Sequence, residues 1–327
     1  MHDETNPYFN AMIHPTMALF VTFTTILTLG EYETNYPLSP NVKERRTMIE
    51  IGLTGFGDHP ELYGKLKAPE RLPAYSTHFP IVEIDSSFYA VQPVKNVTRW
   101  VEQTPEHFGF IFKAYQGMTG HLRGKKNYFD TKEEMFAAFH VSLQPALDAG
   151  KLRMALFQYP PWFDCTRDNV DTLRETRELM KDIPCALEFR NRTWYMPEFR
   201  ERTLEFMRQE NWIHTIVDEP QAGIGSIPII SAATSTQATY VRMHGRNVDG
   251  WHKSNHPDWR KLRYLYRYST EELTEWRDRL LELQQQSEHI YVVFNNNSAG
   301  DATPNAQELI ALLAEQHALS DNHRVDS

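Results

Sequence analysis

The sequence has very little cysteine. Cys165 and Cys185 are the only two among 327 residues, so neither a disulfide framework nor a zinc site built from cysteines is available. A reducing compartment is the simplest setting for such a chain. We therefore expect a cytoplasmic protein.

Long apolar runs are also lacking. The longest, Met17 to Leu29, has thirteen residues of which four are Thr, whereas a membrane-spanning helix needs roughly 20 apolar residues. Residues 1–16 contain no Lys or Arg, which a secretory signal would carry before its apolar run. We expect no membrane partner. Met48 directly precedes the first clear strand pattern, so residues 1–47 are expected to be an extension outside the fold.

The chain lacks an excess of positive charge. It has 34 basic and 43 acidic residues and a formal net charge of -9, so it is not a polycation suited to coating nucleic acid or an anionic membrane. Binding of that kind would have to be local. The content of hydrophobic (41%) and charged (24%) residues is that of an ordinary globular protein.

From residue 49 onward, short runs of apolar, β-branched or aromatic residues alternate with stretches of helical spacing. The predicted strands are Ile49–Phe56, Ile81–Phe88, Gly109–Tyr115, Met154–Tyr159, Cys185–Arg190, Ile213–Asp218, Thr239–His244 and Ile290–Asn295. The predicted helices are Pro93–Thr104, Thr131–Ala149, Asp168–Lys181, Pro197–Gln209, Thr270–Gln285 and Pro304–Glu315. No helix is predicted for Gln221–Ala233, which is rich in Gly, Ser and Ile.

Eight strands with helical crossovers predict an α/β fold, a (β/α)8 TIM-type barrel forming a single domain. An open doubly wound sheet is the structural alternative, but no GxGxxG motif follows the first strand. We assign residues 48–316 to the barrel and 317–327 to a C-terminal tail. In such barrels the site lies where strands end and the following loops begin.

Polar residues gather late in the predicted strands. Residues two apart share a face, and the positions between them are apolar, so Glu83 with Asp85, and Glu188 with Arg190, are expected to point into the barrel. We predict catalytic roles for Asp85, Glu188, Asp218 and His244. The predicted substrate-binding residues are Lys113, His121, Gln158, Tyr159, Arg190, Asn191, Trp194, Arg242, Arg246, Asn295 and Asn297.

The structural interpretation of these charges is that they pair and simply stabilise the barrel interior. We favour that interpretation for Glu83 and Arg242, which lie deepest. Glu83, Asp85, Glu188, Asp218 and His244 would also suffice as ligands for a divalent cation. Arg and Lys in the same mouth would repel a cation, so we prefer an anionic ligand and leave the metal and cofactor unassigned.

Two loops on this rim are basic. The segment Arg242–Tyr268 has seven basic and two acidic residues, interleaved with Trp251, Trp259 and three Tyr. Aromatic rings among cations can stack on bases or sugar rings, although such a segment can equally pack on itself. We prefer a loop that closes over substrate. The second loop, Gly120–Lys126, combines glycine with four basic side chains, counting His121.

Seven motifs in this order resemble the proteins called domain of unknown function 72, or YecE-like. The matching motifs are IEIGLTGFGDH (Ile49–His59), FPIVEIDSSFYA (Phe79–Ala90), FKAYQGMTGH (Phe112–His121), LFQYPPWF (Leu156–Phe163), LEFRNRTWY (Leu187–Tyr195), YVRMHGRN (Tyr240–Asn247) and YVVFNNNSAGDA (Tyr291–Ala302). The resemblance implies a (β/α)8 barrel and no assigned activity. The family is loosely grouped with sugar isomerases and with barrel nucleases, whose several metal-binding His have only His244 as a counterpart here.

The expected function is a rim pocket for an anionic, hydroxyl-rich ligand such as a sugar phosphate or nucleotide, with acid–base chemistry of an isomerase or hydrolase type if the protein is an enzyme. Two alternatives remain open. One is metal-dependent phosphodiester cleavage, and the other is non-catalytic nucleic-acid binding by the basic aromatic segment. The sequence does not indicate the oligomeric state.

Overall fold

The strands form a closed barrel in the computed structural model, which describes residues 48–124, 127–252 and 257–325. They pair in chain order, all in parallel, and β1 closes the barrel against β8. The strands are β1 (Met48–Thr54), β2 (Ile81–Ile84), β3 (Gly109–Lys113), β4 (Leu152–Gln158), β5 (Cys185–Glu188), β6 (Trp212–Asp218), β7 (Ala238–Met243) and β8 (His289–Phe294). This confirms the predicted (β/α)8 barrel.

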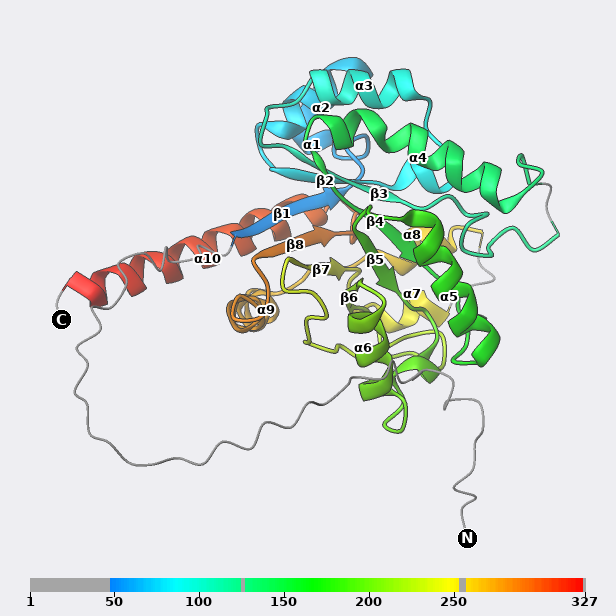
Figure 1. Cartoon of the computed structure of the whole chain (residues 1–327). Coiled ribbons are helices and arrows are strands. Elements are labelled where there is room, and N and C mark those ends of the chain that lie inside the picture. The colour runs from blue at the N-terminus through cyan, green and yellow to red at the C-terminus, as the bar shows by residue number, and fades with distance from the viewer. Residues whose placement is uncertain (1–47, 125–126, 253–256, 326–327) are drawn as a thin grey trace, which may run out of the picture.

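Helices cover the outside of the barrel, and α10 lies against β1 and β8 (Figure 1). They are α1 (Pro60–Tyr63), α2 (Ala68–Ser76), α3 (Val94–Glu102), α4 (Lys132–Asp148), α5 (Arg167–Met180), α6 (Arg200–Gln209), α7 (Val248–His252), α8 (Trp259–Arg263), α9 (Thr270–Leu283) and α10 (Ala302–Val325), with the 3-10 turns η2 (Asp85–Phe88) and η3 (Arg192–Tyr195). All six predicted helices are present. α10 continues well past Glu315, the helix end that the sequence predicts.

The second strand is shorter than predicted. It ends at Ile84, because the next four residues turn into η2. The Ser87 hydroxyl contacts the carbonyl oxygens of both Ile84 and Lys113, at 2.6 Å each, and such side-chain bonds to the backbone compete with a continuing strand. Asp85 therefore lies at the start of a turn on the rim.

Two apolar layers hold the barrel together. Between strands and helices, side chains such as Leu187 and Val241 pack against Leu173, Trp276 and Leu309. A smaller cluster fills the interior from the early strand positions, namely Ile81, Ile111, Met154, Leu156, Ala186, Ile213, Ala238, Tyr240, Tyr291 and Val293. The interior is thus apolar near the strand beginnings, which leaves the later inward positions to polar groups.

The neighbouring strands β1 and β2 approach each other closely at Gly52. A Cβ atom added at Gly52 would lie 2.1 Å from the carbonyl oxygen of Ile81, so only glycine allows this approach of the two strands.

No helix in the described part of the chain has the length and apolar character needed to cross a bilayer. The predicted extension, residues 1–47, lies outside the described residues.

Candidate functional site

Glu83 and Arg242 form the deepest ion pair of the barrel interior. Arg242 donates from Nε and Nη2 to the two carboxylate oxygens of Glu83, at 2.8 and 2.7 Å, and Tyr240 donates its hydroxyl to the same carboxylate. Both side chains are 0–1% exposed. A bidentate pair of this kind compensates two buried charges that would otherwise be costly. The structure confirms the pairing that the sequence favoured.

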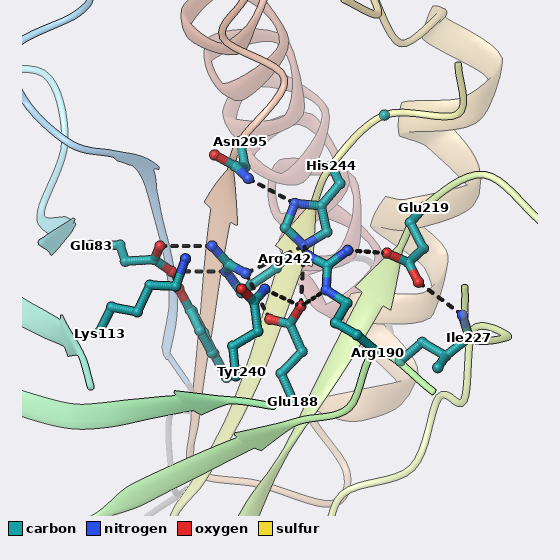
Figure 2. Close-up of polar contacts among 12 residues, drawn as sticks. Glu83, Lys113, Glu188, Arg190, Glu219, Ile227, Tyr240, Arg242, His244 and Asn295 are labelled. Atoms are coloured by element: carbon teal, nitrogen blue, oxygen red, sulfur yellow. Dashed lines mark hydrogen bonds and ion pairs between the residues drawn. The ribbon is translucent and has the colours of Figure 1, made fainter. Parts of the chain in front are cut away.

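Glu188 connects this pair to the upper part of the site (Figure 2). Its carboxylate is 2.7 Å from Nη1 of Arg242, 2.6 Å from Nε of Arg190, and accepts a bond from Gln158 Nε2 at 2.6 Å. Burial opposes ionisation, but the guanidinium groups of Arg190 and Arg242 outweigh it and hold the pKa of Glu188 well below its usual range. Glu188 therefore stays ionised and holds two arginines in place.

Glu219 is a functional candidate that the sequence reading missed. It follows β6, is 2% exposed, and binds Arg190 Nη1 through one oxygen and the backbone N–H of Ile227 through the other. Burial raises its pKa to about 7, against the opposing charge of Arg190. Glu219 lies six residues after the inward-facing Ile213, and an even spacing places both on the same face of the strand. Extending the predicted strand by one residue would therefore have predicted that Glu219 points inward.

His244 is neutral and fully buried among the two arginines. Arg190 Nη2 donates to its Nε2 at 2.7 Å, so the ring proton must be on Nδ1, which lies 2.8 Å from the amide of Asn295. The amide nitrogen of Asn295 faces Nδ1 in Figure 2, and turning the amide group over would present the oxygen that accepts this proton. Burial, followed by the charges of Arg190 and Arg242, holds the pKa of His244 well below its ordinary value. His244 thus contacts Nη2 of Arg190, while Glu188 and Glu219 bind its Nε and Nη1.

Lys113 and Asp85 lie nearer the rim. Lys113 Nζ donates to Asp85 Oδ1 at 2.8 Å and lies 4.7 Å from the ring centre of Phe88. Their side chains are 11% and 31% exposed, more than those of the deeper pairs. His121, on the loop after β3, is half-buried with its Nδ1 2.9 Å from the Thr119 hydroxyl. Burial, with the charges of Lys113 and Arg190, lowers the pKa of His121 to about 4.

The segment after β7 folds over Arg190. Trp251 of α7 is buried, and two guanidinium groups lie over its ring, Arg263 at 3.7 Å and Arg190 at 5.7 Å. The Tyr264 ring is 5.8 Å from that of His244. Burial lowers the pKa of Arg263, and the charge of Arg190 acts in the same direction. The segment therefore forms one side of the site, while residues 125–126 and 253–256 lie outside the described residues.

Asp218 and Arg246 do not join this network. Arg246 donates to both carboxylate oxygens of Asp218, and Trp276 of α9 donates its indole N–H to the same group. Asp218 lies five residues after the inward Ile213, so alternation turns it to the helix side. Gly245, with φ +86°, turns the chain between His244 and Arg246. The prediction that these two residues share the mouth was wrong.

Three predicted binding residues are held by contacts outside the Glu188 network. Tyr159 is buried with its hydroxyl 3.1 Å from Thr176 of α5. Trp194 stacks on Phe189 and donates to the carbonyl of Phe163, and Asn191 caps η3. These side chains stabilise the barrel wall, so the expectation that they line the mouth was wrong. Gln158 and Asn295 reach the network, whereas Asn297 is half-buried in the loop after β8.

The predicted metal ligands are not brought together either. Glu83 and Glu188 are bound by guanidinium groups, the Nε2 lone pair of His244 accepts from Arg190, and Asp218 lies elsewhere. Among the described residues, no group of three or more His, Cys, Asp or Glu side chains is arranged to hold a metal ion. Fixed guanidinium groups in direct contact with these donors do not fit a bound divalent cation.

Residues 50–326 match the family described as "Protein of unknown function DUF72". The chain belongs to the DUF72 family. It is 57% identical over 268 residues to the UPF0759 protein YunF of Bacillus subtilis strain 168, which covers 81% of this chain and 95% of the relative. The family resemblance drawn from the seven motifs is thus confirmed.

Two solved DUF72 structures share the fold. One, from Enterococcus faecalis V583, has a TM-score of 0.76 at 38% identity and covers 82% of this chain and 96% of its own. The other, from Thermotoga maritima MSB8, has a TM-score of 0.70 at 30% identity and covers 82% and 99%.

Proposed function

We propose that this DUF72 protein binds a small anionic, hydroxyl-rich ligand, of the sugar phosphate or nucleotide type, at the carboxyl ends of its strands. One observation carries the proposal. Arg190 and Arg263 both lie on the ring of Trp251, close enough for the charge of Arg190 to lower the pKa of Arg263. Arg190 is already paired with Glu188 and Glu219, so an anion bound here would compensate the charge of Arg263.

The cations divide into two groups. Arg242 is committed to Glu83 and Glu188, and Arg246 to Asp218 and Glu272, so both serve the structure. Arg190 is likewise held, by Glu188, Glu219 and His244. Lys113, which is paired with Asp85 on the rim, and Arg263 lie around the upper part of the barrel and have the charge to hold a phosphate or carboxylate. Neutral His121 contributes a ring nitrogen without adding charge.

Two carboxylates are suited to proton transfer. Asp85 is partly exposed on the rim, and Glu219 has a pKa raised to about 7 by burial, near the value at which a group both gives and takes a proton at neutral pH. Glu188, which stays ionised, is better suited to positioning Arg190. We therefore place acid–base chemistry on Asp85 and Glu219, with Glu188 and His244 as positioning residues.

Thermal denaturation in the presence of ligand tests the proposal. We expect ribose 5-phosphate or adenosine 5′-monophosphate to raise the Tm of the wild-type protein, because a ligand bound only by the native state stabilises it. Arg263→Gln should reduce the rise, whereas Arg208→Gln, on the exposed side of α6, should leave it unchanged. No phosphate-dependent rise in the wild type, or an equal rise in both variants, would contradict the proposal.

The nucleic-acid alternative is not favoured by the described part of the segment after β7. Trp251 is 6% exposed and covered by Arg263, which also lies 5.5 Å from the ring of Trp259. A ring buried to this extent is not available to stack on a base. The described cations and aromatic rings therefore pack on one another.

A further inference from the structure

Four aromatic side chains form a continuous wall on the other side of the mouth, away from the segment after β7. They are Tyr89, Phe88, His121 and Trp162, supplied by the loops after β2, β3 and β4. Neighbouring ring centres are 5.3, 5.0 and 5.8 Å apart in that order, each pair at an edge-to-face angle. We call these four residues the aromatic wall.

The middle of the aromatic wall lies beside the proposed anion site, and its two ends are exposed to solvent. Lys113 Nζ lies 4.7 Å from the ring centre of Phe88. The charges of Lys113 and Arg190 add to burial in lowering the pKa of His121. At the two ends of the wall, Tyr89 is 47% and Trp162 is 44% exposed. Large aromatic side chains left open beside a polar site point to a binding surface.

A cation is held on the Trp162 ring by an unusual loop conformation. The guanidinium carbon of Arg123 lies 3.6 Å from the ring centre of Trp162. Arg123 itself has φ +31°, a left-handed value that costs energy for a residue with a side chain, and it is followed by Gly124 at φ +74°. The loop therefore presents a flat, exposed guanidinium stacked on Trp162.

From this arrangement we infer that the aromatic wall is a subsite for a flat heteroaromatic ring, so that the ligand class of this site is a nucleoside phosphate. Nucleobases stack on aromatic side chains and on the planes of arginine guanidinium groups, and the Trp162 end of the wall offers both. The phosphate would lie near Lys113, Arg190 and Arg263, two rings further in. A bare sugar phosphate has no ring to stack on Trp162 or Arg123.

This inference rests on the proposed anion site, and calorimetric titration of the full chain separates the two. The probes are adenosine 5′-monophosphate, ribose 5-phosphate and inorganic phosphate. We expect wild-type protein to bind the nucleotide about tenfold or more tightly than ribose 5-phosphate, because stacking adds to the phosphate contact. Trp162→Ala should weaken nucleotide binding by about tenfold and leave ribose 5-phosphate binding unchanged.

Arg123→Ala should weaken nucleotide binding in the same selective way. Tyr128→Ala is the matched control, since Tyr128 is a 79% exposed aromatic residue outside the wall, and it should leave all three affinities unchanged. Equal wild-type affinity for nucleotide and ribose 5-phosphate, or an equal loss for both in Trp162→Ala, would overturn the ring subsite and leave the anion site standing. If wild-type protein binds none of the three probes, both proposals fail.

Discussion

Glu188 and Glu219 are both buried carboxylates that bind Arg190, yet their pKa values are shifted in opposite directions. Burial favours the neutral form of each. Glu188 also contacts Arg242, and two guanidinium groups outweigh the cost of burial, whereas Glu219 has the charge of Arg190 and one backbone N–H, which do not. The number of fixed donors thus decides which carboxylate keeps its proton near neutral pH.

Glu219 should make stability depend on pH. Its pKa of about 7 in the native protein exceeds its ordinary value of 4.5, so the native state binds this proton more tightly than the unfolded chain. The resulting stabilisation is complete below about pH 4.5 and is lost as the pH rises through 7, a difference of about 3 kcal/mol. We expect Glu219→Gln to remove this pH-dependent part, measured by urea unfolding at several pH values between 4.5 and 8.

The control for this measurement is Glu201→Gln, which changes a carboxylate that is 74% exposed. It should follow the wild-type pH dependence, because it alters no buried group. If Glu219→Gln also follows the wild-type curve, the buried carboxyl of Glu219 does not carry a proton near neutral pH.

At the scale of elements, α4 and α5 differ in how they begin. Both have a threonine at the N-cap with extended backbone, but Thr131 accepts a hydrogen bond from the N–H of Glu134, whereas Thr166 makes no such bond. We expect Thr131→Ala to lower the free energy of unfolding by about 1 kcal/mol and Thr166→Ala to lower it by clearly less. Chemical denaturation of both variants checks this, and equal losses would show that the cap bond contributes nothing.

The elements were largely predictable because apolar periodicity decides them. The eight strands and six long helices follow from it, whereas α1 and α2, which contain Pro60, Pro69 and Pro73, were not predicted. Two of these prolines stand in the first helical turn, where no N–H is needed. In the site, the alternation of side chains along the strands predicted that Glu83 and Arg242 both point into the barrel, where they pair. Asp218 was misplaced because the sequence did not indicate which of its two faces β6 turns inward.

At the scale of the whole molecule, the strands that close the barrel all lie among the described residues, since β1 begins at Met48 and finds its partners in β2 and β8. We expect a chain beginning at Met48 to unfold within about 0.5 kcal/mol of the full chain, as for changes away from packed or bonded groups. Parallel urea titrations of the two chains measure this. A larger loss would mean that the first 47 residues contribute to the stability of the barrel.

Closure of β1 on β8 has a consequence for biosynthesis. Met48 pairs with His289, so β1 cannot pair with β8 until the ribosome has added 241 more residues. At about 5–20 residues per second, ribosomes need on the order of 10–50 s to add them. During that interval one edge of β1 is unpaired, and unpaired strand edges favour aggregation and chaperone binding. The time for which the nascent chain needs protection is therefore set by the separation of β1 and β8 in the sequence.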